Sequence, residues 1–465
     1  MYGRSVQVLF FGAAALVLAG VQGAAAQSVT EQPHKHETTP QEPDSPGQDQ
    51  GMIRDGSGTS WLPDATPMYA FHWQRGEWQV MLHENAFLQF LDESGDRGSD
   101  QAGSINWVMG MAQRTAGPGR VMFRGMLSAE PWTVGGCGYP DLLASGERCN
   151  GEAIHDRQHP HDLMMELSAR YDAPLAGSVR WQVYGGPVGE PALGPVAYPH
   201  RISAFPNPLA PIAHHWLDST HVTFGVLTGA LYGQRWKSEI SVFNGREPDE
   251  DRADFDLGAL DSVSGRVWFL PSAKVALQFS AGQLAEAETI EAFDSAQARA
   301  GEASDLTRVT ASATYHTTVR EQDGEQALWA TTIAWGRNIE SGHGSNAILA
   351  ETNFTLRDRD SWFARFEAVG KTAHDLALAE SDEAFTVAKL QGGYTRSLTT
   401  WRGLKPGVGA TLSAGFVPAD LSAAYGGRVN VGYGVFLTLR PAAMTMHGGH
   451  DVGGVDHSQH GSPRP

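Results

Sequence analysis

Apolar and polar residues alternate along most of the chain, with the period of two that is typical of β-strands lying between two different environments. In the last such segment, Val429, Val431 and Val435 alternate with small or polar residues such as Asn430 and Gly432. The pattern predicts an all-β fold of about sixteen antiparallel strands. The segments begin near Trp78, Ser104, Arg120, Leu163, Ser178, His221, Trp236, Ser262, Val275, Thr307, Ala327, Asn346, Trp362, Phe385, Gly407 and Arg428.

The connections between these segments are alternately short and long. Short turns are expected at 115–119, 172–177, 229–235, 271–274 and 357–361. Long loops are expected at 131–162, 185–220, 244–261, 284–305 and 371–384. Short turns on one rim and long loops on the other are typical of outer-membrane β-barrels, whose long loops lie outside the cell. The chain is therefore expected to form a closed antiparallel transmembrane β-barrel.

The first residues have the pattern of a secretory signal peptide. Arg4 precedes an apolar run from Val6 to Val21, and Ala24 and Ala26 form an A-x-A cleavage site. An uncleaved anchor is the alternative, but the run is shorter than the roughly 18 residues of a spanning helix. We expect export through a cleaved signal peptide to the outer membrane of a Gram-negative cell.

No apolar stretch long enough for a spanning helix follows the leader, so a membrane would have to be crossed by strands. The last strand resembles the C-terminal signal that the barrel-assembly machinery recognises, through Asn430, Gly432, Val435 and Leu437. Outer-membrane lipid and this machinery are the expected partners. The expected organisation is a signal peptide at 1–26, a disordered N-terminal segment at 27–67, the barrel at 68–441 and a Met/His-rich disordered tail at 442–465.

A soluble periplasmic β-sandwich or β-propeller is the alternative architecture, since its strands alternate as well. It would turn the apolar face of each strand into a core. The net charge of −18 disfavours nucleic acid as a partner.

The two cysteines, Cys137 and Cys149, lie close together in a glycine-rich part of the first long loop. An exported chain reaches an oxidising compartment, so a disulfide is expected, with a redox or metal role as the alternative.

Histidines are concentrated in the first two long loops. Imidazole and carboxylate groups are ligands for Zn²⁺, Cu²⁺ and Ni²⁺. Neighbouring loops on one rim are close in space, so the two groups are expected to converge on a metal ion. The alternative is that they only form hydrogen bonds within folded loops. The candidate ligands are His155, His159 and His161 in the first loop and His214, His215, Asp218 and His221 in the second.

A further set of candidate ligands lies in the tail, which the strand count places in the periplasm. Thioether and imidazole groups together suit copper, as Cu(I) or Cu(II). A solubilising tail with incidental histidines is the alternative. The candidates are Met444, Met446, His447, His450, His457 and His460.

Three stretches of the chain resemble an uncharacterised family of bacterial outer-membrane barrels found with copper and heavy-metal resistance systems. They are residues 156–167, 214–221 and 244–249. The resemblance implies a role in metal handling and a periplasmic metal-handling partner.

The expected function is that of a porin-like barrel that binds or passes metal ions, with copper favoured. The alternative is a structural or metal-sequestering barrel whose lumen is plugged by the two long loops. An outer-membrane hydrolase is a weaker hypothesis, because Ser219 and His221 form the single Ser/His pair worth naming; no enzymatic activity is expected. Residues expected to face the lumen are Arg180, Arg266, Glu351, Asn353, Arg365, Glu367 and Arg428.

Overall fold

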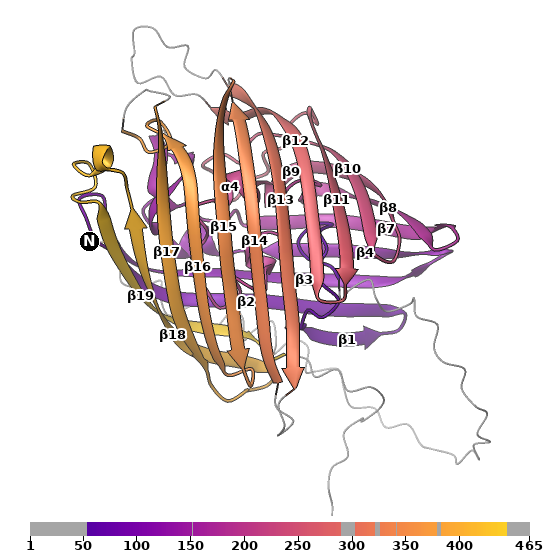
Figure 1. Ribbon diagram of the computed structural model, residues 1–465. Helices are drawn as coiled ribbons and strands as arrows, with labels where there is room; N and C mark the ends of the chain where they lie inside the picture. The colour runs from indigo at the N-terminus through magenta and orange to yellow at the C-terminus, as the bar shows by residue number, and fades with distance from the viewer. Residues whose placement is uncertain are drawn as a thin grey trace, which may run out of the picture. The chain divides into compact units, whose positions relative to one another are not determined.

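The computed structural model describes residues 54–150, 152–289, 303–320, 326–340, 342–378 and 383–443. In this part of the chain, sixteen antiparallel strands form a closed β-barrel (Figure 1). The last strand, β19, pairs with the first, β2, and so closes the sheet. The wall strands are β2 (Trp78–Glu93), β3 (Asp100–Ala116), β4 (Gly119–Leu127), β7 (Met164–Ala176), β8 (Val179–Gly189), β9 (Thr223–Tyr232), β10 (Trp236–Phe243), β11 (Ser262–Ser272), β12 (Val275–Thr289), β13 (Ala303–Arg320), β14 (Gln326–Glu340), β15 (His343–Leu356), β16 (Asp360–Thr372), β17 (Ala384–Ser397), β18 (Leu404–Phe416) and β19 (Val429–Pro441).

Every strand expected from the sequence is present, and the alternation of short and long connections is confirmed in outline. An exception is the connection between β14 and β15, which lies on the long-loop rim but is short: β14 ends at Glu340 and β15 begins at His343. No helix among the described residues is long and apolar enough to cross a membrane.

The apolar face of the wall points outward. On β19, Val431, Tyr433 and Val435 are about half exposed, whereas Asn430 is buried inside the barrel. A β-sandwich or propeller would bury this apolar face, so both alternatives are wrong. An apolar exterior around a polar interior is the arrangement of a barrel that contacts lipid.

Aromatic side chains gather on the exterior near the short-turn rim, where many of the wall strands begin or end. Neighbouring strands bring them together in pairs such as Trp362 and Tyr394, whose ring centroids are 5.5 Å apart. Aromatic girdles of this kind mark the membrane–water interface of outer-membrane barrels. Exposed members are Phe123, Trp236, Phe269, Trp329, Phe354, Trp362 and Trp401.

The lumen is filled by the chain itself, beginning with the segment that precedes β1 (Phe71–Arg75). Gly58, Thr59 and Trp61 are buried in this segment. The expectation of disorder over 27–67 is therefore wrong from residue 54 onward, while 27–53 lies outside the described residues. The segment has little apolar alternation because it has no lipid-facing side: it meets polar wall residues and also apolar ones, since Trp61 shares a buried cluster with Trp268 of β11.

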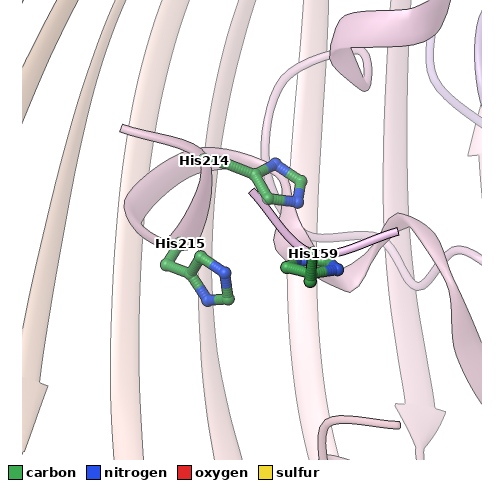
Figure 2. Close-up of side chains that lie close together, drawn as sticks. All are labelled: His159, His214 and His215. Atoms are coloured by element: carbon green, nitrogen blue, oxygen red, sulfur yellow. The ribbon is translucent and has the colours of Figure 1, made fainter. Parts of the chain in front are cut away.

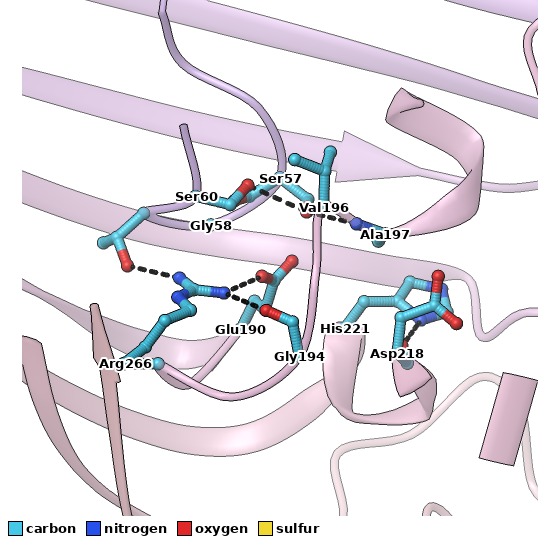
Figure 3. Close-up of polar contacts among 12 residues, drawn as sticks. Ser57, Gly58, Ser60, Glu190, Gly194, Val196, Ala197, Asp218, His221 and Arg266 are labelled. Carbon is cyan, nitrogen blue, oxygen red and sulfur yellow. Dashed lines mark hydrogen bonds and ion pairs between the residues drawn. The ribbon is translucent and has the colours of Figure 1, made fainter. Parts of the chain in front are cut away.

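Buried wall cations hold this lumen segment in place. Arg170 on β7 forms a bidentate ion pair with Asp55, with both N–O distances 2.8 Å. Lys237 on β10 donates to the carbonyl oxygen of Thr59 at 2.6 Å. Arg266 on β11 donates to the Thr59 hydroxyl at 3.1 Å and to Glu190 of the β8–β9 loop at 3.1 Å (Figure 3).

The long loops after β4 and β8 fill most of the remaining lumen. The first contains helix α3 (Glu130–Thr133) and a hairpin of β5 (Tyr139–Cys149) and β6 (Glu152–Gln158). The second contains η2 (Tyr198–His200), α4 (His214–Leu217) and η3 (Ser219–His221). The expected disulfide between Cys137 and Cys149 is confirmed, and its Cα atoms are 5.7 Å apart.

Most residues expected to face the lumen do so and bind the loops. Arg365 on β16 is 2% exposed and donates to the carbonyl oxygen of Leu209 at 2.8 Å. Glu351 on β15 accepts from Arg201 at 2.7 Å. Arg180 is partly buried, and Arg428 is exposed in the loop before β19, so its expected lumen position is wrong.

Candidate metal centre

The short helix α4 carries two of the candidate histidines and is fixed directly to the barrel wall. The backbone N–H of Ala213 donates to Glu367 Oε1 at 2.9 Å. The carbonyl oxygen of His215 accepts from Asn338 Nδ2 at 3.0 Å and also from Arg308. Trp216 Nε1 donates to Ser345 Oγ at 2.7 Å. Helix α4 lies behind β13, β14 and β15 in Figure 1 and contacts all three strands.

Three buried histidines from two loops meet at this helix. His159, in the loop after β6, lies against His214 and His215, with ring centroids 6.1 and 5.7 Å away (Figure 2). One ring nitrogen from each of the three lies within 4.8 Å of the others. The sequence-based expectation that the two long loops bring their histidines together is therefore met for these residues.

Each of the three imidazoles has a carboxylate at its Nδ1 atom. Nδ1 of His214 lies 2.9 Å from Asp218 Oδ1, and Nδ1 of His215 lies 2.9 Å from Glu247 Oε1. Nδ1 of His159 lies 3.1 Å from Glu147 Oε2 and forms a hydrogen bond with the carbonyl oxygen of Pro160 at 3.2 Å. A carboxylate acceptor selects the tautomer with hydrogen on Nδ1 and leaves the Nε2 lone pair free.

The opposite nitrogens are buried without protein partners. Within the described part of the chain, Nε2 of His159 and Nε2 of His215 accept no hydrogen bond and are closed off from solvent. Buried polar atoms almost always have a partner, and leaving one without costs about 1–3 kcal/mol. A metal ion between the rings would satisfy these nitrogens.

Burial also keeps two of the three rings neutral. It lowers the pKa of His159 well below its usual value, and nearby Arg252 adds to the effect. It lowers the pKa of His214 to about 4, even though Asp218 acts in the opposite direction. Neutral imidazole is the form that binds a metal ion.

Two further histidines extend the cluster. His221 lies 5.1 Å from His214 and 5.2 Å from His161 between ring centroids. Burial lowers the pKa of His221, and its Nε2 atom has no partner among the described residues. His161 has both nitrogens occupied, since Nδ1 lies 3.0 Å from Glu130 and Nε2 lies 3.2 Å from the Tyr198 hydroxyl.

The charge of His161 is set differently from that of its neighbours. Burial opposes protonation, but the carboxylates of Glu130, Asp162 and Glu147 together outweigh it and raise the pKa of His161. His161 is therefore less suited to hold a metal ion than the three rings around α4.

The remaining expected ligands divide into three groups. Asp218 is a partner of a ligand rather than a ligand, because its carboxylate oxygens already bind His214 and Arg201. His155 lies outside the cluster, where it contacts Arg97 and Asp156. The tail candidates Met444, Met446, His447, His450, His457 and His460 lie outside the described residues.

Sequence reasoning missed Glu147 and Glu247 as supporting carboxylates. Glu147 lies near the end of β5, and the neighbouring Gly146 packs against the ring of His215. A Cβ atom at Gly146 would lie 2.3 Å from His215 Nε2, and the backbone there has φ of +118°. Spacing along the chain gives no signal for this contact, because the hairpin folds back across the lumen.

No protein-family model matches the chain, and no curated protein matches it in sequence. Among solved structures, it is similar to OmpT, an outer membrane protein of Vibrio cholerae, with a TM-score of 0.46, 10% identity, and 79% of this chain and 99% of that chain covered. It is also similar to Salmonella typhi OmpF in complex with daunomycin, with a TM-score of 0.48, 9% identity, and 79% and 100% covered. For the outer membrane channel DcaP of Acinetobacter baumannii the TM-score is 0.40, with 9% identity and 80% and 100% covered.

Proposed function

We propose that this chain is an outer-membrane β-barrel that binds a divalent transition metal ion inside its own loop-filled lumen. The proposal rests on the meeting of His159, His214 and His215, whose Nδ1 atoms lie beside carboxylates. Two of their Nε2 atoms have no partner among the described residues. The barrel wall is the scaffold that holds this assembly rigid.

The surface of the barrel supports a location in the outer membrane. Apolar residues cover its exterior, and aromatic side chains ring the short-turn rim. With the short turns in the periplasm, the long loops that carry the histidines belong to the outside of the cell. The metal site then lies on the side from which an external ion arrives.

Copper is the favoured metal. Imidazoles are borderline ligands that suit Cu²⁺, Zn²⁺ and Ni²⁺, and affinity among first-row divalent ions generally peaks at Cu²⁺. Carboxylate partners at the rear nitrogens raise the basicity of the ligands and orient the rings.

Binding fits the lumen better than free passage. The inward side chains of Arg266, Glu351 and Arg365 are at most 2% exposed, because loops and the lumen segment cover them. The proposal therefore follows the alternative of a plugged, metal-sequestering barrel rather than that of an open porin.

The test measures Cu²⁺ binding to the full folded chain in detergent. Calorimetry gives the stoichiometry, and pulsed electron paramagnetic resonance detects the ligands. The wild-type protein should show a site with several imidazole ligands, each detected through its remote Nδ1 nitrogen. His159→Ala should remove that site, whereas His343→Ala, which changes an exposed histidine at the start of β15, should keep it. Equal stoichiometry and an unchanged imidazole signal in His159→Ala would show that the cluster is not a metal centre.

A further inference from the structure

The methionines of this chain gather in one place inside the barrel. Six buried methionines and two partly buried ones, of the chain's 12, form a single cluster. They come from β2, β3, β4, β7 and the lumen segment before β1. The members are Met68, Met81, Met109, Met111, Met122, Met126, Met164 and Met165.

This concentration is not a general feature of the interior. Every other buried apolar cluster among the described residues is built from leucine, isoleucine, valine, alanine and aromatic side chains, and none contains methionine. The barrel fills space elsewhere without thioethers, so packing alone does not account for eight of them together.

The strand register sets the thioethers side by side with an imidazole. His83 on β2 pairs directly with Met109 on β3, and Met109 pairs directly with Met126 on β4. In the adjacent row, Met81 pairs with Met111. Opposite residues on antiparallel strands have Cβ atoms about 4.5–5.5 Å apart, which is within reach of a shared ion for side chains of this length.

His83 carries an unsatisfied nitrogen at this position. Its Nε2 atom is buried and has no hydrogen-bond partner in the described ranges. Its ring packs at a tilt against Trp107, with the centroids 6.2 Å apart, and Trp107 in turn packs against His200 at 5.0 Å.

The cation in the adjacent row is already paired. Arg124 pairs with Met111 across the sheet, but its guanidinium lies 3.4 Å from Glu166 Oε1 and donates to the carbonyl oxygen of Gly58 at 2.8 Å. The donors that remain are the thioethers and the His83 imidazole, with His72 of β1 opposite Met81. Neutral soft donors suit a soft monovalent ion better than a hard divalent one.

We propose that His83, Met109 and Met126, with Met81 and Met111 in the next row, form a site for a soft monovalent cation, Cu(I) or Ag(I). The site is separate from the centre at His159 and uses different ligand atoms. It does not rest on the proposed function.

The experiment uses Ag(I), which needs no reductant, and the full folded chain with ¹³C-labelled methionine methyl groups. Ag(I) should shift the methyl resonances of Met109 and Met126, which are assigned from single leucine variants. Exchange of methionine for leucine keeps the apolar volume and removes the sulfur. Met109→Leu with Met126→Leu should weaken Ag(I) binding by more than about tenfold.

Two control variants separate this site from the other candidates. Met444→Leu with Met446→Leu and, independently, His159→Ala should leave the Ag(I) shifts of Met109 and Met126 in place. If the double leucine variant does not fold, as judged by its mobility on unheated gels, the methyl shifts of the wild-type protein test the proposal by themselves. Ag(I) shifts confined to methionines outside the cluster, or unchanged affinity in a folded double variant, would overturn the proposal.

Discussion

At the scale of single residues, the candidate metal centre depends on which atom of each histidine is occupied. The convergence of His159 with His214 follows from two neighbouring loops on one rim, so it was predictable from the sequence. The supporting roles of Glu147 and Glu247 were not, because each glutamate approaches from a separate part of the fold. Candidate ligands can be recognised in the sequence, whereas the carboxylates that support them can be recognised only in the folded structure.

Glu247→Gln tests the support of His215. An amide oxygen still accepts the Nδ1 hydrogen but carries no charge, so Cu²⁺ affinity should fall about 10- to 100-fold. Calorimetry on the folded chain measures this. Glu77→Gln is the matched control, because Glu77 is exposed and pairs with Arg114 at the opposite rim. Equal affinity in both variants would remove Glu247 from the site.

The lumen segment at 54–62 docks against Glu190, the first residue after β8, and this docking should depend on pH. Burial raises its pKa from 4.5 to about 7, with Arg266 acting in the opposite direction. Between pH 4.5 and 7 the docked state therefore holds more protons than the undocked one, so docking weakens as pH rises through this window.

Hydrogen exchange of the amides at 54–62, corrected for intrinsic rates, should accordingly be faster at pH 8 than at pH 5. Glu190→Gln should remove most of the difference, because glutamine does not titrate in this range. A wild-type protein whose corrected exchange is constant with pH would contradict the expectation.

At the scale of elements, the wall and its contents differ in how well the sequence predicts them. All the wall strands alternate between an apolar exterior and a polar interior, so each has a pattern of period two. Most residues of the β5–β6 hairpin and of the segment at 54–62 lie inside the wall, where apolar and polar wall residues and other loops surround them. They have no exterior face, and so no alternation identifies them.

The disulfide between Cys137 and Cys149 should act on the hairpin alone. Cys137→Ser with Cys149→Ser should loosen the hairpin by about 3 kcal/mol, as expected for a short closed loop. Limited proteolysis should then cut within β5–β6, and Cu²⁺ affinity should fall because Glu147 supports His159. Gel mobility of the folded barrel should stay the same; its loss would show that the disulfide stabilises the wall.

At the scale of the whole molecule, the closed barrel and its apolar exterior were predictable, whereas the filling of the lumen was only one of two alternatives. The inward charges of Arg266, Glu351 and Arg365 look alike in sequence whether they line water or bind a loop. Their partners decide the matter, and those partners lie far away in the chain.

The filled lumen predicts that the intact protein gives little or no conductance in planar bilayers. Gly58→Val should raise it, since the backbone there has φ of +51° and a Cβ atom would lie 2.6 Å from the Cβ of Glu190. The lumen segment should therefore leave its position. Gly110→Ala is the control, because no atom lies within 4 Å of the added Cβ. Large conductance in the wild-type protein would show an open pore.

The lumen segment precedes every wall strand in the chain, and this order has a consequence for biogenesis. Synthesis from the N-terminus makes the lumen segment before the strands that enclose it, and β2, the first wall strand, later receives β19 as its final partner. The wall can thus assemble around a lumen segment that is already present, and closure of the β2–β19 seam completes the enclosure. No later insertion step through a finished wall is needed.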